Sequence, residues 1–236
     1  MEKRQARIER EMKQLVVPHK KGEIAFAYPS VGPNIYSKVG AEILKQGMKV
    51  PIGGYIASLV HSVYSDDSVV SEPEFQEIKE IIRERELLIF NRNLWTKEGV
   101  YVVPDPEAIG KSQPLNQNDL EKMLKESKEF NGIRFSRDGK VRFAPKGSYQ
   151  LGTHSPEYLT KDGFMIASYG TEGAEKLAEV SSKFPNQPTI HGIETDTPEQ
   201  TVSSLGTYYF ASLDVNGNHS ENHRLSYAFG LKQETQ

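Results

Sequence analysis

Cysteine is absent from the 236-residue sequence. This absence excludes disulfide bonds, thiolate zinc sites, iron–sulfur clusters and cysteine nucleophiles, and it fits a reducing compartment. Long apolar runs are also absent, since the longest ones are far shorter than the ~20 residues that a membrane-spanning helix needs. The opening segment, MEKRQARIEREMKQ, lacks the apolar centre of a signal peptide. We therefore expect a soluble, cytoplasmic protein without a membrane partner.

Motifs that would name a reaction are missing as well. The sequence has no G-x-S-x-G element, no internal repeat and no low-complexity tract. Leu, Ile, Val and Phe are nevertheless abundant enough to build a core. The length allows one large domain or two small ones.

A large net charge is lacking too, since 29 basic residues stand against 32 acidic ones. The charge is unevenly distributed, however. Segment 130–150 has five cations against Asp138 alone, whereas segment 151–236 has five basic and eleven acidic residues. A basic strip therefore precedes an acidic C-terminal half.

The order of apolar residues predicts an α+β fold with a mainly helical N-terminal part and a mixed-sheet, β-rich C-terminal part that contains short interleaved helices. The proline-rich segment 104–118 is interpreted as a connection between parts 1–103 and 119–236, although a loop within one compact domain explains it equally well. Helices are expected in the N-terminal part at 2–15, 35–46, from Gly53 onward and at 71–86, the last one opened by a capping box at Ser71.

The C-terminal part is expected to alternate between strands and short helices. Its clearest element is a hairpin of 133–136 and 140–144 around Asp138-Gly139. The other strands expected in this part are 164–169, 189–193, 207–213 and 225–231, and strands are also expected before the connection at 23–28, 87–90 and 100–103. One helix is expected to begin near Asn118, and three others are expected to span 156–161, 172–183 and 197–205.

Imidazole and carboxylate groups gather at the ends of predicted C-terminal strands. They suggest a divalent metal site, because these are the metal ligands open to a chain without cysteine. The ligands would be His191, His219, His223 and Asp214, and Glu194 or Asp196 would act as the general base of a metal-dependent hydrolase or lyase. The alternative is a polar hairpin loop that turns at Asn216-Gly217.

Two further features have both a functional and a plain interpretation. Gly170-Thr171-Glu172-Gly173 follows a predicted strand and opens a helix, where a phosphate can bind, but Glu172 would repel it. The basic hairpin is a candidate surface for nucleic acid or a partner, although its aromatic residues fall on the core side and an ordinary solvated strand face is favoured. Its cations are Arg134, Arg137, Lys140, Arg142 and Lys146.

The function favoured by the sequence is a binding or assembly protein that recognises a protein, a small ligand or a second copy of itself. The charged helix expected at 2–15 is a candidate for self-association. The metal-dependent enzyme is the first alternative, and a nucleic-acid accessory protein that uses 133–146 is the second. No cofactor other than a possible divalent metal ion is indicated.

Overall fold

The computed structural model of the chain describes residues 4–208 and 211–232. The strands within these ranges are β1 (Arg7–Glu9), β2 (Gln14–His19), β3 (Gly22–Ala27), β4 (Val31–Asn34), β5 (Glu86–Thr96), β6 (Gly99–Pro104), β7 (Lys128–Phe130), β8 (Ile133–Phe135), β9 (Arg142–Pro145), β10 (Gly152–Thr153), β11 (Thr189–His191), β12 (Glu199–Tyr208), β13 (Ser212–His219) and β14 (Ser226–Ala228). The helices are α1 (Tyr36–Lys45), α2 (Gly53–Ser65), α3 (Pro73–Glu84), the 3₁₀ turn η1 (Gly110–Ser112), α4 (Gln117–Met123), α5 (Pro156–Leu159) and α6 (Gly163–Ser181).

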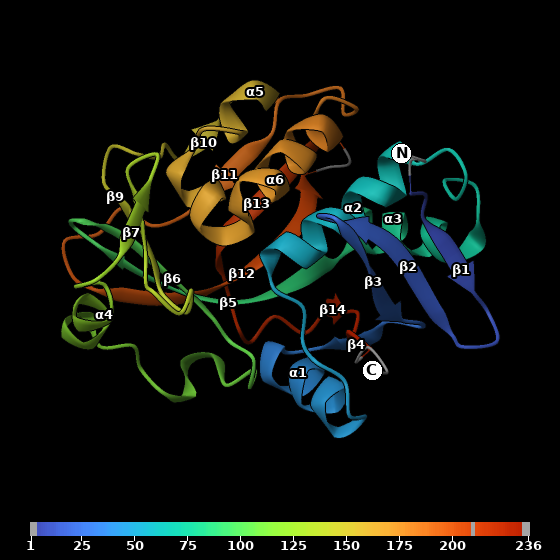
Figure 1. The fold of residues 1–236 in the computed structure, drawn as a ribbon, viewed down its shortest axis with the longest axis horizontal. Helices are drawn as coiled ribbons and strands as arrows, with labels where there is room; N and C mark the ends of the chain where they lie inside the picture. Colours follow the sequence, from blue (N-terminus) through green and yellow to red (C-terminus); the bar gives the residue numbers. More distant parts are fainter. Residues whose placement is uncertain (1–3, 209–210, 233–236) are drawn as a thin grey trace.

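Most strands belong to one large mixed sheet (Figure 1). Its main path runs β10-β11-β13-β12-β5-β6-β9-β8-β7. Strand β14 is joined to it by parallel pairing with β5 and by antiparallel pairing with β4. Strands β1, β2 and β3 form a separate antiparallel sheet beside α2 and α3 (Figure 1).

Strand β5 shows why the large sheet is buried on both faces. Leu87 and Ile89 belong to the main core, which includes side chains of α2, α3 and α6. Leu88 and Phe90 point the other way, into a second core with α1. Successive side chains of a strand alternate between faces, so a continuous apolar run is expected where helices cover both.

The fold is sheet-rich, and its N-terminal part is not mainly helical, which corrects the predicted fold class. Segment 2–15 is the clearest error within the described residues: β1, a turn and the start of β2 occupy it instead of a helix. Ala6 and Leu15 are buried there, and Ile8 packs against the same core. Arg7 between Ala6 and Ile8 is exposed, so the apolar residues here alternate with a charged one, as in a strand.

Two C-terminal predictions are wrong in opposite directions. Segment 164–169, expected as a strand, is the first part of α6, while 197–205, expected as a helix, lies mostly in β12. The Asn216-Gly217 pair lies inside β13 rather than in a turn. Predicted capping at Ser71 is also wrong, since α3 begins after Glu72 without a side-chain cap.

The connection at 104–118 is fixed by specific hydrogen bonds. Asp105 accepts from the Tyr36 hydroxyl at 3.1 Å and from the Gly110 amide at 2.8 Å. Strand β5 precedes this connection and pairs with β12, which follows it, so the sheet combines strands from both sides. The division into separately folding parts stays a prediction.

No helix in the described ranges has both the length and the apolar character needed to cross a membrane.

Candidate functional site

The structure brings the predicted metal-binding side chains together in two pairs. His191 on β11 lies next to Asp214 on the parallel strand β13, with 3.6 Å between Nε2 and Oδ1. The Asp214 carboxylate raises the pKa of His191. His219 and His223 form the other pair, with ring centroids 5.2 Å apart and one ring nitrogen of each 3.2 Å from the Ser226 hydroxyl.

The two predicted general bases lie apart from these pairs. Glu194 lines a pocket of about 720 Å³ together with Lys146 and His154, and none of the three predicted histidine ligands lines that pocket. Asp196 is exposed in the connection before β12. Among the residues that the structure describes, no three His, Asp or Glu side chains are grouped so as to hold a metal ion. The metal site and its general base therefore stay predictions.

His219 has a consequence for stability in acid. Burial, together with the charge of His223, lowers the pKa of His219 to about 4. An unfolded histidine takes up a proton below about pH 6.5, whereas folded His219 stays neutral until about pH 4, so the folded state loses stability as the pH falls through this interval. We expect this histidine to contribute a loss of about 3 kcal/mol to the free energy of unfolding between pH 7 and pH 4, measured in urea.

The matched variant for this measurement is His219→Gln, which has no titrating group. It is expected to lose about 3 kcal/mol less than the natural protein over the same pH interval. Burial raises the pKa of Glu86, and this acid contributes with the opposite sign in both proteins, so it cancels in the difference. Identical pH dependence in the two proteins would show that His219 is not held neutral.

The five cations of the predicted basic strip have different surroundings, and their role as a binding surface stays a prediction. Arg134 makes a two-pronged contact with Glu121, at 2.7 and 3.1 Å, and its guanidinium lies over the ring of Phe143. Arg137 and Lys140 remain exposed and pair with neighbouring acids. The other two cations line two different pockets: Lys146 the one with Glu194, and Arg142 the one described next.

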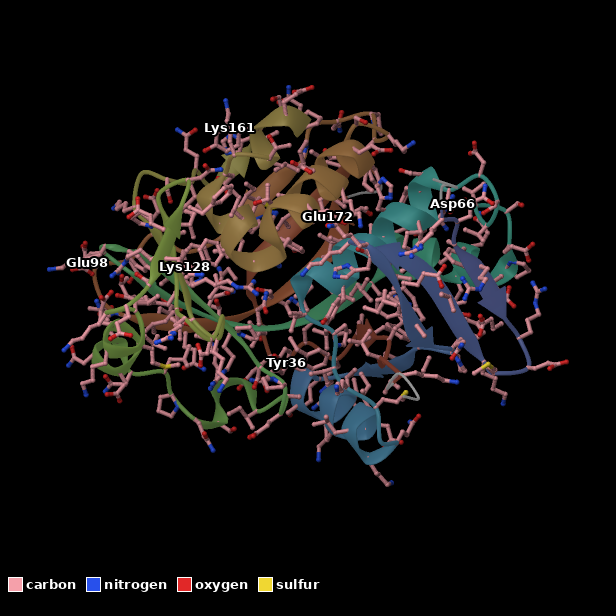
Figure 2. All side chains as sticks on the ribbon, in the orientation of Figure 1. Tyr36, Asp66, Glu98, Lys128, Lys161 and Glu172 are labelled. Carbon is pink, nitrogen blue, oxygen red and sulfur yellow. The ribbon has the colours of Figure 1, made fainter. Side chains whose placement is uncertain are left out.

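A pocket of about 280 Å³ lies where α2, α6 and the turn between β2 and β3 meet. Figure 2 labels Glu172 at this point, where α6 passes the N-terminal end of α2. We call this 280 Å³ pocket the α2–α6 pocket. Its lining residues are His19, Lys20, Ile52, Gly54, Tyr55, Ser58, Arg142, Tyr169, Gly170, Thr171, Glu172 and Gly173.

Glycine allows the two helices to approach so closely. A Cβ atom on Gly53 would lie 2.1 Å from the carbonyl oxygen of Ser168, and one on Gly173 would lie 2.9 Å from the Cβ of Tyr169. The contact of Gly53 crosses from α2 to α6 and is too short for real atoms, so a side chain there would push the two helices apart. The contact of Gly173 lies within α6, and its nearest neighbour on α2 would be the Cβ of Ala57 at 3.3 Å, which is also tight. The glycines therefore determine the geometry of this wall of the pocket.

Two helical starts face the α2–α6 pocket. Helix α2 begins after Ile52, which provides no side-chain cap. Helix α6 is interrupted at Gly170, whose φ of 75° and ψ of 166° are not helical, and a second helical segment starts just after it. The first N–H groups of a helical segment have no acceptor within the helix, and they carry a partial positive charge.

Arg142 is the cation at the base of this arrangement. It is partly buried, and its Nη1 donates to the carbonyl oxygen of Ala167 at 2.8 Å. Burial lowers the pKa of Arg142, with no acidic neighbour acting against it. Within residues 4–208 and 211–232, no carboxylate forms an ion pair with this guanidinium.

A polar network centred on Ser58 adjoins the pocket. The Ser58 hydroxyl lies 2.8 Å from Nδ1 of His19 and accepts from Nζ of Lys176 at 2.9 Å. Lys176 also pairs with Glu172 at 2.8 Å, and Glu172 accepts from the Lys20 amide at 3.2 Å. Burial, followed by the charges of Lys176 and Lys20, lowers the pKa of His19, so its ring is neutral at neutral pH.

Sequence reasoning singled out Arg142 and the Gly170–Gly173 motif, which both line this pocket, but it missed the polar network around Ser58. The Gly170–Gly173 motif does open a helical segment, but the repulsion expected from Glu172 is reduced by its ion pair with Lys176. His19 and Lys176 lie 39 and 118 positions from Ser58 along the chain. No local spacing joins them, so only the fold could bring them together.

Comparisons with known proteins assign no family. No protein-family model and no curated protein matches the chain. Among solved structures, it is similar to one described as showing the accommodation of massive sequence variation in Nanoarchaeota by the C-type lectin fold. The two sequences are 12% identical, the alignment covers 86% of this chain and 98% of that one, and the TM-score is 0.49.

Proposed function

We propose that this chain is a binding protein and that it takes a small anionic ligand, a phosphate or a carboxylate, into the α2–α6 pocket. The observation that carries the proposal is Arg142, a partly buried guanidinium without a carboxylate partner among the described residues. A guanidinium has five N–H donors in a planar fork that matches carboxylate and phosphate oxygens. Only one hydrogen bond from it to the described protein is formed, at Ala167.

The surroundings of Arg142 favour the same ligand class. Lys20 and Lys176 add two positive charges near the pocket, and among the described residues Glu172 is the one acid that lines it and is already paired with Lys176. The uncapped starts of α2 and of the second segment of α6 favour negative charge at their ends. The electrostatic balance is therefore positive.

The size and walls of the pocket limit the ligand further. A volume of about 280 Å³ is near the lower end for small-molecule sites, and it is too small for a large cofactor. Tyr55, Tyr169 and Ile52 provide apolar surface next to the cations. A compact anion with a short apolar portion fits this combination.

The test is Arg142→Gln, studied by isothermal titration calorimetry with inorganic phosphate, acetate and succinate at constant ionic strength. Hydrogen bonds to a charged group contribute about 1.5–3 kcal/mol, so the dissociation constant of the anion that binds should rise roughly 10- to 150-fold. The matched control is Arg137→Gln, which removes an exposed guanidinium from the same hairpin. It should leave binding unchanged.

Two outcomes would overturn the proposal. One is that none of the three anions binds saturably to the natural protein. The other is that Arg142→Gln and Arg137→Gln weaken binding equally, because a general charge effect and not the pocket would then explain the affinity.

A further inference from the structure

Ser58 is the meeting point of the polar network in the α2–α6 pocket. Its hydroxyl oxygen lies 2.8 Å from a histidine nitrogen, 2.9 Å from a lysine nitrogen and 3.2 Å from the Gly54 carbonyl oxygen. Ser58 lines the pocket, on α2 one turn beyond Gly54. A serine that reaches both an imidazole and an ammonium group has the two partners that activate a nucleophile.

The roles of these partners follow from their chemistry. An ammonium group has three donors and no acceptor, so Lys176 can only donate to Ser58. Lys176 forms an ion pair with Glu172, and its positive charge favours the alkoxide form of the serine. His19 accepts the Ser58 proton at Nδ1 when its own proton is on Nε2. The ring of His19 also packs edge-on against Tyr55, with centroids 5.0 Å apart, which orients it.

We infer that Ser58 is a nucleophile for acyl transfer, with His19 as general base and Lys176 as the stabilising cation, acting on a small ester whose anionic group lies at Arg142. The position of the ester rests on the proposed anion site. The nucleophile itself rests on the contacts of Ser58, which are independent of Arg142.

The reaction is balanced with water as the only co-reactant. The Ser58 oxygen attacks the ester carbonyl carbon while its proton passes to Nδ1 of His19. The C–O bond of the ester then breaks, and the leaving alkoxide takes the proton from His19. Water attacks the resulting acyl-Ser58, giving its proton to His19, and the carboxylic acid leaves as Ser58 regains a proton. The two helical starts line the same pocket as Ser58, and their uncapped N–H groups are the donors available for a tetrahedral oxyanion.

The first experiment treats the full chain with diisopropyl fluorophosphate and measures the mass of the intact protein. The serine oxygen displaces fluoride from phosphorus, so one adduct is expected, located at Ser58 by peptide mapping. Ser58→Ala should form none. The matched control is Ser62→Ala, which removes another buried hydroxyl from α2 and should label like the natural protein. Lys176→Met and His19→Gln should each slow labelling at least ~10-fold.

The second experiment uses the absence of cysteine, since Ser58→Cys introduces the only thiol of the chain. The pH dependence of its alkylation by iodoacetamide reports the pKa of that thiol. The cation of Lys176 should hold it below the usual value of about 8.5, and adding Lys176→Met should raise it. Ser62→Cys on the same helix is the comparison, and it should show no such dependence on Lys176.

The outcomes separate this inference from the anion site. Anion binding that depends on Arg142, without a covalent adduct on Ser58, would overturn the nucleophile and leave the binding proposal intact. Labelling of Ser58 without anion binding would do the reverse. An adduct elsewhere, or labelling of Ser58 that neither Lys176→Met nor His19→Gln slows, would also overturn the nucleophile.

Discussion

Replacing Trp95 with alanine is expected to lower the free energy of unfolding by about 3–5 kcal/mol, the range for large aromatic residues in a core. Trp95 is fully buried on β5, and its ring packs against Phe164, with centroids 5.2 Å apart. Its indole N–H donates to the Thr201 hydroxyl at 2.9 Å. A Cβ on Gly217 would lie 2.9 Å from the indole, so the backbone of β13 is already fitted to it and cannot easily fill the space that alanine leaves.

The measurement is a urea titration followed by far-UV circular dichroism, because the substitution removes the only tryptophan of the chain. Phe130→Ala is the control, since this phenylalanine is 51% exposed on β7 and should change stability by less than about 0.5 kcal/mol. A loss below about 1 kcal/mol for Trp95→Ala would mean that the described packing around β5 is wrong.

Gly53→Ala is expected to destabilise the protein although alanine is the better helix former. Helix propensity alone favours alanine over glycine by up to about 1 kcal/mol. The new Cβ, however, would lie 2.1 Å from the Ser168 carbonyl oxygen, and a backbone atom cannot rotate away as a side chain can. Overpacking of this kind costs about 1–3 kcal/mol. We expect a net loss of about 2 kcal/mol, together with weaker anion binding, because α2 and α6 must separate at the pocket.

Gly22→Ala is the matched control for this substitution. The nearest neighbour of the new Cβ atom would be the His19 carbonyl oxygen at 3.9 Å, which is an ordinary contact. The free energy of unfolding should therefore change by less than about 0.5 kcal/mol. Thermal or urea unfolding gives the free energy of unfolding of both variants. A stabilised Gly53→Ala protein would show that helix propensity outweighs the contact and that the two helices are farther apart than described.

Helices α1 and α2 could be predicted because their signals are local. Apolar residues recur at helical spacing in both, and Gly47 after α1 has the positive φ of 74° expected of a residue that ends a helix. The hairpin around Gly139 is confirmed for the same reason, since its turn has φ of 71° there and β8 pairs with β9. The expected faces are wrong, however, because Arg134 lies opposite Phe143 and Phe135 opposite Arg142, so the two aromatic residues pack against different cores. In each case neighbouring residues contain the whole pattern.

Helix α6 could not be predicted in the same way. Residues 164–169 are buried on every side, so no polar face reveals the helical period, and a short apolar run is as typical of a central strand. The helix predicted at 197–205 is wrong because a local helix signal is present but misleading. Its Thr-Pro-Glu-Gln motif resembles a helix start, but β12 pairs with both β5 and β13, and these distant hydrogen bonds outweigh the local preference.

In the candidate site, too, local signals could be predicted and contacts between distant residues could not. The Gly170 motif was recognisable as a helical start, and Arg142 was assigned to an exposed strand face because its neighbours alternate. Its partly buried position depends on α6, which packs against β9 and provides the Ala167 carbonyl. His19, Ser58 and Lys176 come from three separate elements, so their juxtaposition is a property of the tertiary structure.

The pairing of β14 has a consequence for the order of events during synthesis. Strand β14 pairs with both β4 and β5, and just beyond it the Lys232 amide donates to the Ala25 carbonyl and Leu231 exchanges hydrogen bonds with Lys49. On a ribosome, residues 25–49 emerge long before the segment that completes their hydrogen bonding. Contacts between such distant positions form late because the intervening chain must first be closed into a loop. Residues 25–49 therefore lack part of their hydrogen bonding until β14 and residues 231–232 have left the exit tunnel.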